Sequence, residues 1–146
     1  MSYEENLKAL GITLPEAPKP VAAYVPGLKV GNFIYTSGQL PMVNGSLAYT
    51  GKVGREVSVK EAYEAAKICA INCLSVVRSL IGSLDNVKQV IKVVGFVSSA
   101  AGFTQQPQVV NGASELLEKV FGPAGVHARS AVGVAELPLG APVEVE

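Results

Sequence analysis

An arginine stands inside an apolar segment near the end of the chain. Arg129 lies in the sequence HARSAV at 127–132, where the pattern predicts a strand. Burying a guanidinium without an anion costs several kcal/mol, so Arg129 is expected to have a carboxylate partner. A salt bridge within the protein would serve as well as the carboxylate of a bound ligand, and this pattern alone leaves both open.

Two acidic side chains stand among the last four residues. Glu144 and Glu146 alternate with Val143 and Val145, which places both carboxylates on one face of a predicted strand. Such alternation is by default a solvated strand face. The pattern alone therefore assigns the two acids no further role.

The thiols and the imidazole do not form a metal-binding pattern. Cys69 and Cys73 are four residues apart in a helix-like stretch, where a disulfide fits poorly, so both are predicted to be small buried thiols. A metal site would need more ligands, and the only histidine, His127, is far away in sequence. The sequence therefore predicts no metal site.

The composition indicates one globular domain. Of the 146 residues, 49% are hydrophobic and 16% are charged, which is too apolar for disorder and leaves apolar surface that is expected to meet another chain. Twelve basic residues balance twelve acidic ones, so no global field would draw the chain to nucleic acid or to an anionic membrane. No basic segment leads into a long apolar run, and the expected location is the cytoplasm.

Short elements are predicted at the start of the chain. Residues 4–11 have the pattern of a short amphipathic helix, and a proline-rich connector follows it up to Pro20. Apolar pieces at 21–25 and 28–30 surround the turn signal Pro26-Gly27 and predict a hairpin or an edge region.

The next elements begin with a strand that ends at a turn. Residues 32–37 are rich in aromatic and β-branched side chains, and Gly38 follows them. Asn44-Gly45 is a strong signal for a hairpin. Ser58 and Glu61 form a capping-box pattern that opens a long helix, which Gly82 would stop.

The second half of the chain alternates strands and a helix. Residues 87–97 predict a largely buried strand with a bulge at Gly95, and residues 105–121 predict a helix. Two β-rich pieces follow at 128–137 and 143–146. The order β-β-β-α-β-α-β-β predicts an α+β domain with a mixed β-sheet and two helices packed on one face.

Three blocks of sequence resemble one known family. The stretch GNFIYTSGQLP at 31–41 is similar to the G-N-x-I-x-T-S-G-Q-I-P motif of the RidA/YjgF family, also labelled the endoribonuclease L-PSP family, and Ala22-Ala23-Tyr24 resembles its G-P-Y segment. ARS at 128–130, VAELP at 134–138 and VEVE at 143–146 resemble its C-terminal signature. The resemblance spans about residues 20–146 and makes residues 1–20 an N-terminal extension of a single domain.

The resemblance implies a fold, an assembly and a reaction. The fold would be that of chorismate mutase from bacilli, assembled as a homotrimer with clefts between subunits. The reaction would be hydrolytic deamination of reactive 2-imino and enamine acids, such as 2-aminoacrylate and 2-iminopropionate, to 2-keto acids and ammonia. The family needs no cofactor and no metal for this, and its partner is a small 2-imino or 2-keto acid rather than a membrane or a nucleic acid.

The resemblance also implies roles for individual residues. Arg129 would clamp the substrate carboxylate, and Glu144 would position or deprotonate the attacking water. The residues expected to bind substrate around them are Tyr24, Ser37, Gly38, Asn111 and Ala131.

Some of these positions have ordinary alternatives or depart from the family pattern. Ser37 could equally be a strand-end hydroxyl bonded to backbone, and Tyr24 a packed interface aromatic. Ala131 stands where the family often has Cys, and its expected contact is through backbone. His127 stands where Pro or Ala is common; its imidazole could enter the cleft and tune the pH response, or be structural.

Two other functions remain open from the sequence. The first is non-catalytic binding of 2-keto acids in the same pocket. The second is an endoribonuclease, a label that some family members carry. Zero net charge, the absence of a paired histidine and the lack of a basic and aromatic stripe count against the second.

Overall fold

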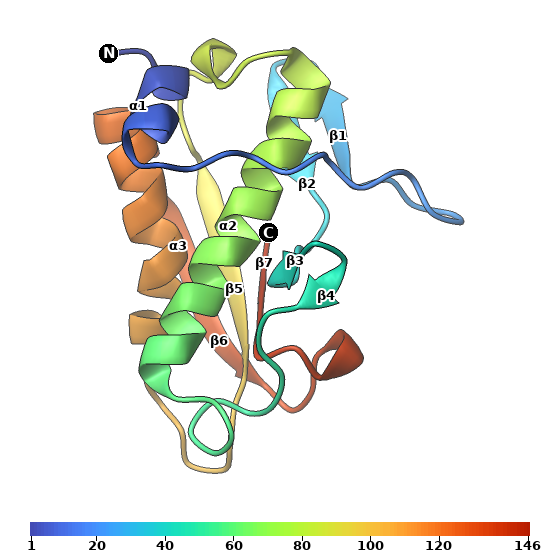
Figure 1. The fold of residues 1–146 in the computed structure, drawn as a ribbon, viewed down its shortest axis with the longest axis vertical. Coiled ribbons are helices and arrows are strands. Elements are labelled where there is room, and N and C mark those ends of the chain that lie inside the picture. Colours follow the sequence, from blue (N-terminus) through green and yellow to red (C-terminus); the bar gives the residue numbers. More distant parts are fainter.

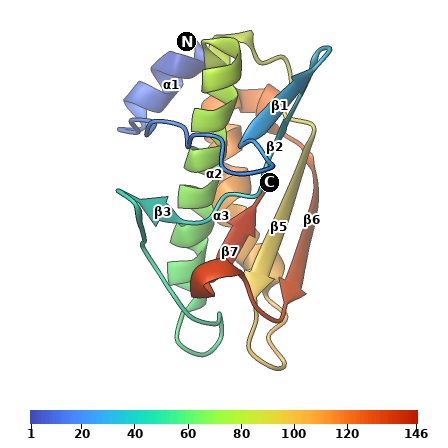
Figure 2. The ribbon, with the colours of Figure 1, turned by 90° about the vertical axis from the view of Figure 1, so that its right-hand side faces the viewer.

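Two long helices cover one face of a three-stranded sheet (Figures 1 and 2). The computed structural model describes all 146 residues. The regular elements, in chain order, are α1 (Tyr3–Ala9), β1 (Gly27–Val30), β2 (Phe33–Thr36), β3 (Met42–Val43), β4 (Ser46–Leu47), α2 (Val59–Ile81), η1 (Leu84–Asn86), β5 (Lys92–Ser98), α3 (Gln106–Phe121), η2 (Gly122–Gly125), β6 (Ala128–Val134), η3 (Pro138–Gly140) and β7 (Val143–Val145).

The central sheet is mixed, as the sequence predicts. Its strand order is β6-β5-β7, with β6 parallel and β7 antiparallel to β5. The parallel pair needs a crossover, which α3 provides. After β2 the chain continues to Gln39, which exchanges two backbone hydrogen bonds with Val145 (2.8 and 3.0 Å). This exchange fixes the residues just after β2 beside β7.

The signals at the start of α2 act as expected. The Ser58 hydroxyl accepts a hydrogen bond from the backbone N–H of Glu61, and the Glu61 carboxylate accepts one from the Ser58 N–H (3.1 and 3.0 Å). Gly82 ends the helix with a positive φ of 84°. The predictions of the capping box and of the glycine stop are both confirmed.

Small residues let α2 and α3 pack closely. A side chain at Gly112 of α3 would overlap the backbone of Tyr63 in α2, so only glycine permits this approach. The apolar faces of both helices meet the sheet at Val93, Val97, Val143 and Val145, which are all buried. This layer is the core of the protein. Cys69 is buried and Cys73 is half-buried within it, and both are free thiols.

Gly95 does not form the predicted bulge. It pairs in regular register with Ala131 on β6 and with Val145 on β7. A Cβ at this position would overlap the side chain of Val110 on α3. The glycine therefore allows the helix to pack closely on the sheet. In a sequence, a glycine within a strand looks the same whether it marks a bulge or a close approach of this kind.

The first hairpin differs from its prediction. Gly27 belongs to β1 rather than to a turn, and β1 pairs antiparallel with β2. The turn lies at Gly31 and Asn32, where Gly31 adopts a positive φ of 59°. The prediction of a turn at Pro26-Gly27 was wrong, because Pro26 lies directly before β1 and Gly27 is its first residue. The Asn44-Gly45 hairpin, in contrast, joins β3 and β4 as predicted.

Two strands are shorter than predicted, and the first helix is well anchored. Extended chain precedes β5, which begins at Lys92, and β6 ends at Val134. Within α1, Leu7 is buried and the ring of Tyr3 packs edge-on against Phe121 at 4.8 Å between centroids. The chain forms no helix that is both long and apolar enough to cross a membrane.

Candidate functional site

The candidate residues lie on opposite faces of the sheet. Arg129 pairs with Val93, whose side chain is in the core, so Arg129 points to the helix face. Glu144 pairs with Phe96 and stands between the buried Val143 and Val145, so it points to the other face. The strands β6 and β7 are moreover separated by β5. A small molecule therefore cannot touch both side chains within one chain.

The first group, which we call the arginine cluster, comprises Asn111, Ser114, His127 and Arg129. Arg129 Nη1 donates to Asn111 Oδ1 at 2.8 Å and to Ser114 Oγ at 3.2 Å, and both partners lie on α3. His127 Nε2 lies 2.9 Å from the same Ser114 Oγ. The helix thus holds the guanidinium by a single nitrogen.

The remaining nitrogens of Arg129 have no hydrogen-bond partner in the chain. Nε and Nη2 form the edge of the guanidinium that fits both oxygens of a carboxylate. The ion pairs of the protein are Lys52–Glu136, Arg55–Glu56 and Arg78–Glu4, and none includes Arg129. The intramolecular salt bridge that the sequence left open is therefore absent, and the half-buried cation is anchored by neutral groups alone.

A polar cavity of about 310 Å³ adjoins the arginine cluster. All four members of the cluster line it, and the other lining residues are Gly125, Val126 and two acids of α3, Glu115 and Glu118. Ser114 was not predicted from the sequence. Its spacing of three from Asn111 on a helix was the available signal, since residues at this spacing share one face.

The second group, the glutamate cluster, comprises Ser37, Gly38 and Glu144, and Tyr24 shares an adjoining hollow with Ser37. Ser37 and Gly38 directly follow β2, and the pairing of Gln39 with Val145 brings them beside β7. A Cβ on Gly38 would lie only 2.6 Å from Glu144 Oε1, so the glycine leaves room for the carboxylate. This close approach was not visible in the sequence.

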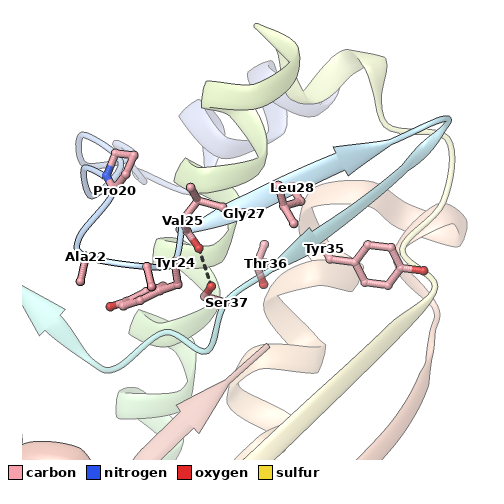
Figure 3. A pocket seen from close by; sticks show the side chains of 10 residues that line it. Pro20, Ala22, Tyr24, Val25, Gly27, Leu28, Tyr35, Thr36 and Ser37 are labelled. Carbon is pink, nitrogen blue, oxygen red and sulfur yellow. Dashed lines mark hydrogen bonds between the residues drawn. The ribbon is translucent and has the colours of Figure 1, made fainter.

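Tyr24 and Ser37 line a hollow of about 560 Å³ beside the β1–β2 hairpin. Its lining is largely apolar, and the ring of Tyr35 points away from Tyr24 and Ser37 (Figure 3). The Ser37 hydroxyl donates to the carbonyl of Val25 at 2.7 Å, which is the ordinary strand-end role considered from the sequence. Tyr24 is 62% exposed, so this chain alone does not pack it.

The environment of Glu144 favours its protonated form. Partial burial raises the pKa of Glu144 above the usual value for glutamate, and the negative charge of Glu146 raises it further. A carboxyl group with a raised pKa is a better proton acceptor and donor near neutral pH than an ordinary glutamate. The pKa of Glu144 is therefore closer to neutral than that of an ordinary glutamate.

Ala131 belongs to neither cluster. Its side chain packs against the hydrophobic core and lines neither cavity. No three His, Cys, Asp or Glu side chains of the chain come together as metal ligands. The candidate residues thus form two separate groups, one around a cation without a carboxylate partner and one around a carboxyl group with a raised pKa.

Comparison with known proteins shows where this fold belongs. The family model described as "YjgF/chorismate mutase-like, putative endoribonuclease" matches residues 4–145, which includes most of the segment that the sequence analysis treated as an extension. The chain belongs to this family. The match confirms the resemblance found in the three sequence blocks and the chorismate mutase-like fold that it implied.

Relatives of the chain carry different names. Protein TCP17 of Trypanosoma cruzi is 46% identical over 142 residues, covering 97% of this chain and 89% of that protein. The 2-iminobutanoate/2-iminopropanoate deaminase of Dermatophagoides farinae is 33% identical, covering 92% of this chain and 91% of that protein. Among solved structures, the protein Atu1372 from Agrobacterium tumefaciens, described as having unknown function, is 49% identical with a TM-score of 0.89, covering 98% of this chain and 87% of that one.

Proposed function

We propose that the protein hydrolyses 2-imino acids to 2-keto acids and ammonia. The observation that carries this proposal is the free edge of Arg129, a half-buried cation that is held by neutral side chains and lacks a carboxylate partner. Such a group is a receptor for a small carboxylate. The deaminase among the relatives supports an imino acid as the molecule that carries it.

The proposed site is assembled from two chains. Arg129 and Glu144 face opposite sides of the sheet, so each cleft takes the arginine cluster of one chain and the glutamate cluster of another. A homotrimer with three such clefts is the assembly we propose. Exposed apolar side chains on one face of the β1–β2 hairpin are available to bury in it: Leu28, Val30, Phe33 and Tyr35.

The two half-sites divide the chemistry between them. Arg129 Nε and Nη2 hold the substrate carboxylate, which fixes the adjacent C=N bond next to Glu144. Glu144 takes a proton from water as the water oxygen bonds to the imine carbon, and it passes that proton to the nitrogen. A second proton moves from the new hydroxyl to the nitrogen, the C–N bond breaks, and ammonia leaves the 2-keto acid.

The energetic demand on the protein is modest. Imines of this kind already hydrolyse in water, so positioning and a single proton shuttle are sufficient. The substrates we propose are 2-iminopropionate, which forms from 2-aminoacrylate, and its close homologues. The raised pKa of Glu144 suits it to both proton transfers.

The test is substitution of Arg129 by lysine. Arg129→Lys keeps the charge but loses the planar fork, so hydrolysis of imines produced by an amino-acid oxidase should fall by about 100-fold or more. The melting temperature should stay near that of the wild type, because Arg129 forms no ion pair. Arg55→Lys, in an exposed pair with Glu56, is the matched control and should keep full activity. Near-wild-type hydrolysis by folded Arg129→Lys protein would refute the carboxylate clamp.

Two other functions make different predictions. A non-catalytic binding protein would bind 2-keto acids through Arg129 without shortening the lifetime of the imine. The family description also names endoribonuclease activity. Zero net charge and a single histidine argue against it, because one chain has no pair of histidines to cleave RNA and no excess of positive charge to attract it. RNA degradation that is lost in a site variant would favour it instead.

A further inference from the structure

The only histidine of the chain is not used by the proposed reaction. His127 lies in the turn between η2 and β6, two residues before Arg129, and is half-buried. Both of its ring nitrogens have partners: Nδ1 lies 2.6 Å from the carbonyl oxygen of Gly125, and Nε2 lies 2.9 Å from Ser114 Oγ. An imidazole fixed at both ends has a defined orientation.

These partners determine where the protons are. The carbonyl oxygen of Gly125 can only accept, so Nδ1 carries a hydrogen. In the neutral ring Nε2 then has a lone pair, which accepts the hydroxyl hydrogen of Ser114. With its hydrogen committed to His127, Ser114 Oγ presents lone pairs to Arg129 Nη1 at 3.2 Å. The hydrogen bonds therefore run in one direction from Arg129 through Ser114 and His127 to Gly125.

We propose that His127 is a positioning residue that orients Arg129 through the hydroxyl of Ser114. A serine hydroxyl rotates freely unless its hydrogen has an acceptor. Without Nε2 as an acceptor, the hydroxyl hydrogen of Ser114 can rotate toward Arg129 and block the lone pairs that accept from Nη1. Arg129 then keeps only Asn111 as an oriented acceptor. The consequence for ligand affinity rests on the proposed function, in which the free edge of Arg129 holds a carboxylate.

Two substitutions of the same residue separate this role from a structural one. The amide nitrogen of asparagine can replace Nδ1, so His127→Asn keeps the bond to Gly125 and loses the acceptor for Ser114. The amide oxygen of glutamine can replace Nε2, so His127→Gln keeps the acceptor for Ser114 and loses the bond to Gly125. A merely structural histidine that holds the turn would need the Gly125 bond.

The measured quantity is the affinity of the assembled protein for 2-oxobutanoate, a stable 2-keto acid. His127→Asn should weaken binding about fivefold, the effect of losing roughly one kcal/mol of oriented hydrogen bonding to a charged group. His127→Gln should stay within about twofold of wild type by the same reasoning. Ser114→Ala should weaken binding of 2-oxobutanoate as much as His127→Asn does. The double variant with both substitutions should bind it no more weakly than either single variant. In imine hydrolysis the change should be in KM and not in kcat.

A second measurement needs no ligand. Because the chain has one histidine, the ¹⁵N resonances of its imidazole are unambiguous. At about pH 8.5, where an ordinary imidazole is neutral, the ring should be the Nδ1–H tautomer with Nε2 unprotonated. In the Nε2–H tautomer His127 would donate to Ser114 instead of accepting from it, and this result would overturn the inference.

The outcomes distinguish this inference from the proposed function. If wild-type protein binds 2-oxobutanoate and His127→Asn binds it equally well, the inference is overturned and the carboxylate site stands. A larger loss of affinity in His127→Gln than in His127→Asn would also overturn it, because His127 would then act by holding the turn through its bond to Gly125. If wild-type protein binds no 2-keto acid, the proposed function fails, and the tautomer alone decides the orientation of Ser114.

Discussion

Replacement of Gly38 by alanine should disable the reaction while preserving the fold. Gly38 has no positive φ, so its backbone conformation accepts a Cβ. That Cβ would lie 2.6 Å from Glu144 Oε1 and 2.8 Å from Glu144 Cδ. The carboxylate must therefore retreat by about 0.8 Å, the difference between 2.6 Å and the 3.4 Å of an ordinary contact. The end of a glutamate side chain can make this movement at little energetic cost.

A displacement of this size is large for catalysis and small for stability. Misplacement of a reacting group by about 1 Å reduces rates by roughly 100-fold, so kcat of Gly38→Ala should fall between about 10- and 100-fold. Its free energy of unfolding should change by less than about 1 kcal/mol, and alanine can even stabilise by restricting the unfolded chain. The KM should change little, because the arginine cluster is untouched.

The assay is imine hydrolysis together with thermal unfolding of the same preparations. Gly133→Ala is the matched control, since its Cβ would also press on the ends of side chains, Gln106 Nε2 at 2.8 Å and Ser99 Oγ at 3.0 Å, and lies in neither cluster. That variant should keep wild-type kcat. Wild-type kcat in Gly38→Ala would refute the role of Glu144, and a strong loss of stability would refute the claim that the carboxylate can move freely.

Two further variants test the electrostatics and the packing. Glu144→Gln should raise the melting temperature at pH 7 but not below about pH 4. Burial raises the pKa of Glu144 in the folded protein, so the wild-type protein loses stability as the pH rises from the ordinary pKa of glutamate to this raised pKa. Glutamine carries no charge and avoids that loss. The exposed Glu16→Gln should show no such difference, and equal stabilisation at both pH values would contradict the explanation. Gly95→Ala should lower the free energy of unfolding by about 1–3 kcal/mol in denaturant titrations, because its Cβ would overlap Val110. In a Val110→Ala background, Gly95→Ala should cost much less, because the overlapping side chain is gone. An unchanged unfolding midpoint in Gly95→Ala would contradict the overlap and mean that β5 can move away from α3.

The helices could be predicted from sequence because their signals are local. The capping box at Ser58 and Glu61 and the apolar spacing of α2 and α3 lie within each segment. The hairpin at Asn44-Gly45 was predictable for the same reason. Gly95 was misinterpreted because its purpose depends on Val110, a residue of another element.

The family resemblance implied clefts between subunits, but the residue patterns alone did not show which candidate residues lie on which face of the sheet. Alternation within a strand shows which residues share a face, but it does not show which face meets the helices or which strands are neighbours. Only the pairing of Val93 with Arg129 and of Phe96 with Glu144 shows that the two side chains point in opposite directions. The family resemblance supplied the residues, and the register of β5 shows that one chain cannot bring them together.

Mixed oligomers of two inactive variants test the two-chain site most directly. Arg129→Lys spoils the arginine cluster and leaves the glutamate cluster intact, whereas Glu144→Gln does the reverse. Co-expressed with different affinity tags and purified as mixed assemblies, the two should regain imine hydrolysis, since some clefts combine an intact half from each variant. Every mixed trimer, in either two-to-one composition, has one cleft in three that combines two intact halves, so the purified assemblies should regain about one third of the wild-type rate. Mixed oligomers as inactive as either parent, or full activity in a wild-type monomer, would contradict a site shared between chains.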